Sequence, residues 1–347
     1  MKIIITNESE TAHFYIRLGF ARALAACGHE PILWDLRVKS AFDVFDEHPD
    51  MDILVTQTYN VNSALYKCIK SKPWIKVTMK GSDWGIAQQE MDLNKYPILV
   101  ANQNEIETII KLYQETGKPD FIDIHYPQKY ANRTHSYWVD NGIKVVGLMS
   151  GADISDYHGG QFDKNLECDI GYVGGYWKYK SHTINKYLIP LTQYDYRMKV
   201  FGNQSWGIPQ YCGFIQNEKV KDLFASAKVC PNISEPHSQE YGNDIVERPF
   251  KLLSCKSCVV SDYVEGMEEV FRDGLVMAKT PQEFKEKIDY FLKNEDKRIE
   301  QAQKGYDIVM NEHTYFHRAA QFFNELNMPN EAQNCLNKYN EILKEIR

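Results

Sequence analysis

A glycine pair followed by two lysines is the segment of this sequence best suited to a phosphorylated ligand. Gly174 and Gly175 come just before Lys178 and Lys180, and a helical pattern begins at Ser181. Glycines allow close approach of the backbone to a ligand, while lysines and the N-terminus of a helix attract anions. We therefore predict that this loop binds a diphosphate.

The segment 241–262 carries a second group of polar and charged side chains. They are Asn243, Glu247, Arg248, Lys251 and Ser261. Pro249 fits the first turn of a helix, on which Arg248 and Lys251, three residues apart, can face the same way. Two cations on one face could meet an anionic ligand. An exposed helix face would explain them equally well.

Two further loops suit a hydroxyl-bearing ligand better than a phosphate. The segment 7–13, NESETAH, contains His13 and two glutamates that would repel a phosphate, but no glycine. A dinucleotide-binding glycine motif is therefore disfavoured. The loop 80–85, KGSDWG, presents Asp83 beside an aromatic ring on which a sugar could stack. A helix cap in the first loop and a plain turn in the second are the alternatives.

Three spacings that could bind a metal or carry redox chemistry have the wrong surroundings. They are the Cys255/Cys258 pair, the His313/His317 pair and the acidic pair Asp50/Asp52. The first does not open a helix after a strand, and the second has no Glu-x-x-His pattern or nearby cysteine. The third precedes a strand, at the end of a sheet away from ligands. We expect no metal site.

The scaffold that positions these segments is predicted to be a parallel α/β fold, because short apolar runs alternate with amphipathic helical segments. The expected strands are Lys2–Thr6, Pro31–Trp34, Asp52–Thr56, Ile75–Met79, Ile98–Ala101, Lys144–Leu148, Asp169–Val173, Met198–Phe201, Lys228–Cys230, Cys258–Ser261 and Leu275–Met277. Ligands bind at the carboxyl ends of parallel strands. The candidate loops after these strands are therefore well placed.

The chain divides into two serial α/β halves followed by helices. A length of 347 residues suggests about two domains, and the stretch 151–165, rich in Gly and Asp, is a plausible hinge. We expect an N-terminal domain over 1–160, a second domain over 161–312, and helices over 313–347. The main expected helices are 11–27, 181–191, 217–227, 245–254, 281–292, 299–311, 314–326 and 330–346.

Composition limits the location and the partners. Forty Lys and Arg residues against 47 Asp and Glu residues give a net charge of −7, which argues against a surface that wraps nucleic acid. The opening apolar run is too short for a signal peptide, and we expect no membrane span. Eight cysteines are too few for a disulfide scaffold. A cytoplasmic location is expected.

The C-terminal half resembles the group-1 glycosyltransferases of the two-domain, type B fold, and most specifically their CgeB-like (spore-maturation protein) branch. The resemblance runs from about residue 169 to 318. It rests on IGYVGG (170–175), FGN (201–203), the run 211–234, the run 247–274 beginning ERPFKLL, and HTYFHR (313–318).

This resemblance implies two Rossmann-like domains that face each other across a cleft, with the last helices crossing back to the N-terminal domain. The acceptor would bind the N-terminal domain. The donor, a nucleotide diphosphate sugar, would bind the C-terminal domain, and neither a metal nor another cofactor is implied. The acceptor could be a glycan, a lipid-linked sugar, a protein or a small molecule.

The resemblance also implies roles for single residues. Gly174, Gly175 and Lys180 would meet the donor diphosphate, and Arg248 would lie near the phosphates or the sugar. Phe214 and Ile215 would line the pocket for the base, with Asn203 at its edge. His13 or Asp83 would be the base on the acceptor side if the reaction inverts the anomeric centre.

One position departs from the family pattern. Lys251 stands where many relatives have a Glu that holds the donor, and a lysine cannot accept a hydrogen bond from a hydroxyl. Glu247, one turn earlier, could take over this role, the donor could be held differently, or the protein could be inactive. A nucleotide-sugar epimerase and a sugar- or nucleotide-binding protein are therefore the alternatives to a glycosyltransferase.

Overall fold

The computed structural model describes residues 1–7, 12–81, 103–130 and 135–346. Contacts divide the chain into unit 1, residues 1–149 and 315–347, and unit 2, residues 150–314. This division lies earlier than the predicted boundary after residue 160. The reason is that the chain before residue 160 is already bonded to unit 2: the Tyr157 hydroxyl donates to Asn217 Oδ1 at 2.7 Å, and the Ser254 hydroxyl donates to the carbonyl of Tyr157 at 2.6 Å.

Unit 1 contains a six-stranded parallel sheet in the order β2-β1-β3-β4-β5-β6. The strands are β1 (Lys2–Asn7), β2 (Glu30–Asp35), β3 (Ile53–Gln57), β4 (Lys76–Lys80), β5 (Phe121–Ile124) and β6 (Val145–Gly147). The sequence predicted all of them except β5, a four-residue strand interrupted by Asp123. The predicted strand Ile98–Ala101 lies outside the described residues. The strand order reverses between β1 and β3, which is where such sheets bind ligands.

The helices of unit 1 come from both the first part and the last part of the chain. They are α1 (Ala12–Ala26), α2 (Ala41–Glu47), α3 (Ser63–Ser71), α5 (Gln103–Thr116), α7 (Ser136–Val139), α15 (Tyr315–Glu325) and α16 (Pro329–Ile346). Local sequence sets several of their ends. Asn62 caps α3, because its Oδ1 accepts from the N–H groups of Ala64 and Leu65.

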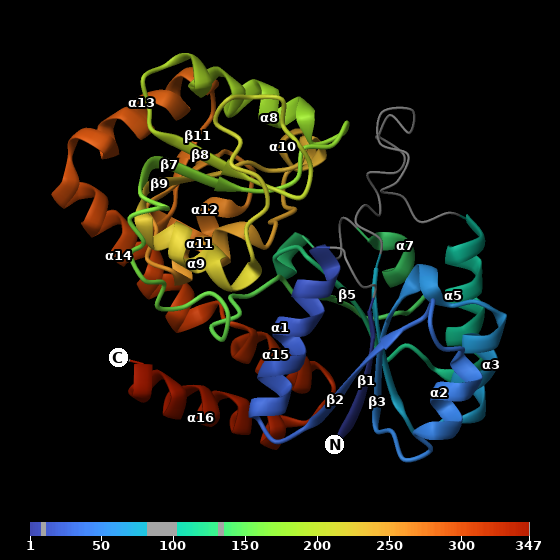
Figure 1. The fold of residues 1–347 in the computed structure, drawn as a ribbon. Helices are drawn as coiled ribbons and strands as arrows, with labels where there is room; N and C mark the ends of the chain where they lie inside the picture. The colour runs from blue at the N-terminus through green and yellow to red at the C-terminus, as the bar shows by residue number, and fades with distance from the viewer. Residues whose placement is uncertain (8–11, 82–102, 131–134, 347) are drawn as a thin grey trace. The chain divides into compact units, whose positions relative to one another are not determined.

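The C-terminal helices α15 and α16 pack against α1, as the red and blue helices in Figure 1 show. The Phe322 ring lies edge-on to Phe20 of α1 at 5.4 Å and to Phe121 of β5 at 5.9 Å. Asn334 Nδ2 donates to the carbonyl of Cys27 at 2.8 Å. The end of the chain thus completes the core of its first half.

Unit 2 contains a five-stranded parallel sheet in the order β11-β10-β9-β7-β8. The strands are β7 (Cys168–Val173), β8 (Met198–Phe201), β9 (Ala227–Asn232), β10 (Val259–Asp262) and β11 (Val276–Ala278). All five predicted strands are present, with ends shifted by at most about two residues. The order reverses between β7 and β9, so the carboxyl ends of these two strands are the expected binding edge.

Helices surround this second sheet. They are α8 (Ser181–Tyr187), α9 (Asn217–Ser226), α10 (Pro236–Tyr241), α11 (Arg248–Ser254), α12 (Met267–Phe271), α13 (Pro281–Lys293) and α14 (Glu295–Glu312), with short 3-10 turns at Ile189–Gln193 and Arg272–Gly274. The sequence missed the short α10 and α12. Thr280 Oγ1 caps α13 by accepting from the N–H of Glu283.

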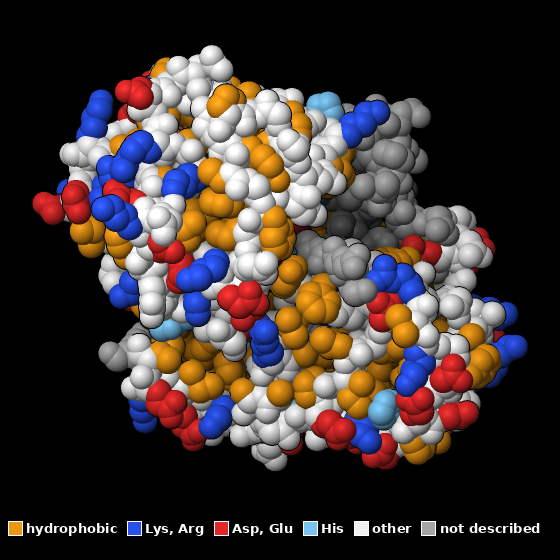
Figure 2. All heavy atoms as spheres, in the orientation of Figure 1, with side chains coloured by type: hydrophobic (Ala, Val, Ile, Leu, Met, Phe, Trp, Pro, Cys, Tyr) orange, Lys and Arg blue, Asp and Glu red, His pale blue; other side chains and the backbone are white. Residues whose placement is uncertain are grey.

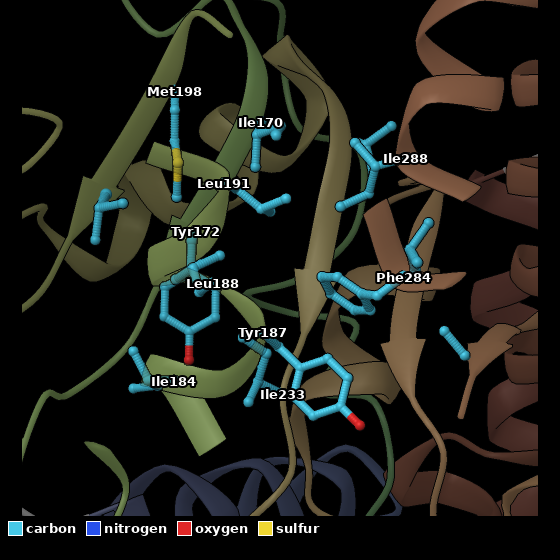
Figure 3. Packing of buried hydrophobic residues seen from close by; sticks show 14 of the residues in the cluster. Ile170, Tyr172, Ile184, Tyr187, Leu188, Leu191, Met198, Ile233, Phe284 and Ile288 are labelled. Atoms are coloured by element: carbon cyan, nitrogen blue, oxygen red, sulfur yellow. The ribbon is translucent and has the colours of Figure 1, made fainter. Parts of the chain in front are cut away.

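Figure 3 shows the core of unit 2, in which side chains from the strands meet those of α8 and α13. The rings of Tyr187 and Phe284 pack edge to face at 5.4 Å. Ile170 and Tyr172, two residues apart on β7, belong to the same cluster. This apolar packing fixes the strand ends that carry the candidate site.

The surface carries mixed charge. On the face drawn in Figure 2, Lys and Arg side chains are interspersed with Asp and Glu side chains. Of the described helices, none combines the length and the hydropathy needed to cross a membrane.

Candidate functional site

The loop after β7 lies against the loop after β8. The N–H of Gly174 donates to the carbonyl of Phe201 at 3.0 Å. A Cβ at Gly202 would lie 2.3 Å from the carbonyl oxygen of Gly174, so only glycine fits at position 202. The Gly174 amide is thus already bonded within the protein, and its predicted contact with a diphosphate stays a prediction. Gly175 is the glycine whose amide could meet a phosphate.

Arg248, at the start of α11, spans the ends of β7 and β9. Its Nη1 donates to the carbonyl of Ile233, just after β9, at 3.1 Å. Its guanidinium lies over the ring of Tyr172, with Cζ 5.1 Å from the ring centroid. Arg248 Nη2 is also 3.1 Å from where a Cβ of Gly174 would be. A planar cation is thus held beside the glycine loop, at the edge where a phosphate would bind.

Lys180 has a different environment from the one predicted. Its side chain is only 4% exposed, and Nζ donates to the carbonyl of Ile233 at 2.9 Å and to Glu235 Oε1 at 2.7 Å. A buried ion pair of this kind holds two loops together. Lys180 therefore fixes the glycine loop to the end of β9, while Lys178 is exposed.

Lys251, the residue that departs from the family pattern, is paired with Glu247. Its Nζ lies 2.6 Å from Glu247 Oε2 and 4.6 Å from the ring centroid of Tyr157. Arg248 lies over a different ring, that of Tyr172, so the two cations have different neighbours, and a shared contact with an anion stays a prediction. Glu247, one helical turn before Lys251, thus neutralises the positive charge of the lysine that stands at the position of the family's glutamate.

Asn243 has both backbone strain and unpaired polar atoms. Its φ is +65°, a left-handed conformation that non-glycine residues rarely adopt. The residue is 1% exposed, and neither amide atom has a hydrogen-bond partner among the described residues. Strain and unpaired buried polar groups concentrate at functional sites. Asn243 is therefore a strong candidate for contact with a ligand.

Two more buried polar atoms lie by the glycine loop. The Tyr172 hydroxyl is 2.9 Å from where a Cβ of Gly174 would be, and Trp206 Nε1 is 3.0 Å from where a Cβ of Gly202 would be. Within the part of the chain that the structure describes, neither has a hydrogen-bond partner. Neither Tyr172 nor Trp206 could be selected from the sequence, because a buried aromatic residue gives no sign there of an unpaired atom.

The segment after β8 presents an exposed aromatic ring. Residues 210–213 run beside β8, where the N–H of Cys212 donates to the carbonyl of Val200 and the N–H of Gly202 to that of Gly213. Phe214, directly after this segment, is 65% exposed, whereas Ile215 packs on a small apolar cluster. Asn203 is exposed. Of the predicted base-pocket residues, Phe214 is the one with a free ring face.

A hydrogen-bonded chain that the sequence analysis missed joins the glycine loop to α10. The Tyr179 hydroxyl lies 2.5 Å from His237 Nδ1, and His237 Nε2 lies 2.9 Å from Asp244 Oδ2. The Tyr179 and His237 rings are stacked at 5.8 Å. His237 lies in α10, which begins shortly after the end of β9, so inspecting the segment after that strand would have found it. The chain adds a second link between the loops after β7 and β9.

Ser261 is buried inside unit 2. Its hydroxyl donates to the carbonyl of Asp262 and accepts from Asn232 Nδ2 at 2.8 Å. Asp262 itself accepts from the N–H and the hydroxyl of Ser234 and from Gln239. Burial raises the pKa of Asp262. These bonds give Ser261 a structural role at the end of β10, unlike the donor contact that the sequence suggested.

The side chains of both predicted acceptor-side bases lie outside the described part of the structure. His13 lies in the first turn of α1, but its side chain is outside the described part, as is the whole of Asp83. The acidic pair before β3 has a structural role: Asp50 forms an ion pair with Lys2 Nζ at 2.7 Å, and Asp52 accepts from the Lys2 N–H.

Metal-like and redox-like spacings gain no support. Within residues 1–7, 12–81, 103–130 and 135–346, no three His, Cys, Asp or Glu side chains are grouped as metal ligands would be. Cys255 and Cys258 are buried free thiols, and burial raises the pKa of each to about 12. Such thiols are unreactive. Independence of a metal remains a prediction.

Sequence comparison identifies a related family for part of the chain. A family model described as "Glycosyl transferase-like" matches residues 185–324, about two-fifths of the chain. The match begins in α8 and ends in α15. No curated protein matches the chain significantly in sequence.

Solved structures match nearly the whole chain. An α-glucosyltransferase in complex with UDP-glucose and DNA has a TM-score of 0.65 at 12% identity, covering 93% of this chain and 98% of that one. HepE from Anabaena with UDP and glucose has a TM-score of 0.62 at 11% identity, covering 94% and 99%. Sucrose-phosphate synthase from Thermosynechococcus elongatus has a TM-score of 0.65 at 10% identity, covering 94% and 98%.

The fold is that of the type B glycosyltransferases. It agrees with the fold that the sequence resemblance implied, with parallel sheets of six and five strands. One of the similar structures contains DNA. The fold therefore does not support the sequence-based exclusion of nucleic acid as a partner.

Proposed function

We propose that this protein is a glycosyltransferase that moves a sugar from a nucleotide diphosphate sugar to a hydroxyl acceptor. The observation that carries the proposal is the edge of the unit 2 sheet, where Arg248 lies over Tyr172 beside the glycine loop. The match to the glycosyl transferase-like family over residues 185–324 supports the same activity. Within this proposal the CgeB-like branch is the finer assignment, and a cytoplasmic location remains an expectation.

The donor diphosphate would bind at the ends of β7 and β9. Arg248 and the Gly175 amide would stabilise the negative charge that develops on the leaving diphosphate. The side-chain amide of Asn243 would donate a hydrogen bond to the nucleotide sugar, and the ring of Phe214 would stack on the base of the nucleotide. Similar structures contain UDP or UDP-glucose, so a UDP sugar is the first donor to test.

The remaining charged residues would position these groups. Lys180 and the Tyr179–His237–Asp244 chain hold the glycine loop against the end of β9. If the reaction inverts the anomeric centre, His13 or Asp83 would be the general base. A glycan, a lipid-linked sugar, a protein, a small molecule or a nucleic acid could provide the hydroxyl.

The test is release of nucleotide from a panel of nucleotide sugars, measured with the full chain. We expect release from at least one donor, and at least about 100-fold less in Arg248→Gln, because a charge-assisted contact to the leaving group is lost. Arg272→Gln is the matched control, since Arg272 is exposed and paired with Glu312. No release from any donor, or equal release by wild type and Arg248→Gln, would contradict the proposal.

The Glu247–Lys251 ion pair favours a second candidate, a protein that binds a nucleotide sugar without transferring the sugar. Glu247 and Lys251 are both largely buried and satisfied by each other in the structure. Nucleotide-dependent thermal stabilisation without any product would support binding alone. A product that keeps its nucleotide would instead indicate an epimerase.

A further inference from the structure

Two buried cysteines meet inside unit 1, where α16 packs against the end of α1 (Figure 1). Cys27 directly follows α1, and Cys335 lies in α16, near the other end of the sequence. Both are free thiols; Cys27 is 6% exposed and Cys335 is fully buried. The thiol of Cys335 donates a hydrogen bond to the sulfur of Cys27. The two sulfur atoms are therefore neighbours in the folded protein.

One face of α16 fits the turn that follows α1. Glu331 Oε2 lies 3.5 Å from His29 Nε2, and Asn334 Nδ2 donates to the carbonyl of Cys27 at 2.8 Å. Residues three and four positions apart share a helix face, so Cys335, four residues after Glu331, faces the same turn. The position of Cys335 opposite Cys27 thus rests also on contacts that do not involve the thiols.

Aromatic packing holds both sides of this contact in place. The ring of Tyr339, one turn after Cys335, lies 5.5 Å from the ring of Phe316 in α15. The ring of His29 lies 4.8 Å from that of Phe323, also in α15. Because these rings fix α16 and the turn after α1 to the same helix, the two thiols are held side by side without a rearrangement of the fold.

The two thiols have unequal environments. The hydrogen bond from Cys335 lowers the pKa of Cys27 and raises the pKa of Cys335 itself. The positive charge of Lys338, one turn after Cys335, also lowers the pKa of Cys27. Cys27 lies between two exposed residues, Ala26 and Gly28. Since the thiolate is the nucleophile in disulfide exchange, Cys27 is the thiol suited to attack and Cys335 the thiol suited to resolve.

A packing role alone does not account for this pair. Buried cysteines often serve only as small apolar side chains. Cys255 and Cys258 of unit 2 are of that kind, because burial raises the pKa of each to about 12. At Cys27 the effect of the neighbouring thiol outweighs burial and the pKa is lowered. Two hydrogen-bonded thiols need only close the gap of that bond to reach the about 2.05 Å of a disulfide.

We propose that Cys27 and Cys335 form a reversible disulfide in the folded protein, with a low-molecular-weight disulfide such as oxidised glutathione as the oxidant. The Cys27 thiolate attacks one sulfur of oxidised glutathione, which forms a mixed disulfide and releases one glutathione thiolate. Cys335 then loses its proton and attacks the Cys27 sulfur, which releases the second glutathione.

The reaction leaves α16 covalently joined to the turn after α1. The two cysteines are oxidised, and the oxidant is reduced to two molecules of glutathione, which take up the two thiol protons. A dithiol reductant reverses the reaction by the same exchange steps. The inference does not depend on the proposed glycosyltransferase function.

The test treats the full folded chain with oxidised glutathione and maps its peptides by mass spectrometry without reduction. We expect a joined peptide pair, one containing Cys27 and the other Cys335, that dithiothreitol separates. Exposed Cys212 should take up glutathione and so show that the oxidant is active. Tm should rise by at least about 4 °C, because a disulfide that closes a long loop stabilises the folded state. Absence of the joined pair, or its formation only in urea, would overturn the proposal.

Variants test the order of the two steps. Cys335→Ser should retain glutathione on Cys27, because the resolving thiol is missing, whereas Cys27→Ser should leave the fully buried Cys335 unmodified. Neither variant should show the rise in Tm. Cys68→Ser is the matched control, since Cys68 is a buried cysteine in α3 of the same unit, and it should form the joined pair as wild type does.

The inference is contradicted if Cys335→Ser carries no glutathione on Cys27, or if Cys27→Ser keeps the rise in Tm. If either variant does not fold, the peptide map of the wild-type chain decides, because it needs no substitution.

Discussion

Replacing Asn243 with glycine should stabilise the protein and weaken donor binding at the same time. The left-handed backbone of Asn243, with φ at +65°, costs about 1 kcal/mol for a non-glycine residue. Its unpaired, buried amide costs about 1 to 3 kcal/mol. Glycine removes both costs and adds about 1 kcal/mol of backbone entropy in the unfolded chain. The free energy of unfolding should therefore rise by about 1 to 3 kcal/mol.

The assay combines thermal unfolding with calorimetric titration of UDP. A gain of about 1 to 3 kcal/mol corresponds to a rise of about 2 to 12 °C in Tm for a domain of this size. The loss of an amide contact should weaken UDP binding by about 10-fold. Asn327→Gly is the matched control, because Asn327 has a φ of +60° but is exposed after α15. It should gain a smaller stability increment and leave UDP binding unchanged.

A lower Tm for Asn243→Gly together with wild-type affinity for UDP would contradict the prediction. That result would mean that the strained, buried asparagine supports the fold of unit 2. A gain in stability with unchanged UDP affinity would equally remove Asn243 from the donor site.

Three further predictions concern the strand ends and loops at the candidate site of unit 2. Lys180→Met should lower the free energy of unfolding by about 3 kcal/mol in urea titrations, because it leaves a largely buried glutamate unpaired. The control Lys178→Met, at an exposed position, should change this free energy by less than about 0.5 kcal/mol. Gly202→Ala should be strongly destabilising in the same titrations, because the new Cβ would lie 2.3 Å from a backbone oxygen. Gly175→Ala should be tolerated, since its Cβ would lie 3.4 Å from the nearest side-chain atom. Burial raises the pKa of Asp262 in the folded state, so the protonated form is favoured there. The stability of wild type relative to Asp262→Asn should consequently fall as pH rises above about 4, and a difference that is constant with pH would count against a raised pKa.

The strands of unit 2 could be predicted because each is an apolar run bounded by polar or glycine residues. The run Met198–Phe201, for example, has the same ends in the structure as in the sequence prediction. The missed strand β5 has only four residues, with Asp123 among them. The packing that stabilises β5 comes from residues that are distant in sequence, such as Phe322, so the strand's own four residues give little sign of it.

The candidate site was predictable in position but less so in the roles of its charges. The rule that ligands bind after parallel strands located the glycine loop and Arg248 correctly at one edge of the sheet. It could not reveal that Lys180 is neutralised by Glu235, because the partner lies 55 residues further along the chain. Nor could it reveal the strain at Asn243, since a backbone angle depends on the packing around it.

The position of a bound nucleotide tests the central claim most directly. A crystal structure of the chain with UDP should show the diphosphate at the carboxyl ends of β7 and β9, within hydrogen-bonding distance of the Arg248 guanidinium. A diphosphate bound at the sheet of unit 1, or failure of UDP, GDP and dTDP alike to bind, would contradict the assignment of unit 2 as the donor-binding half.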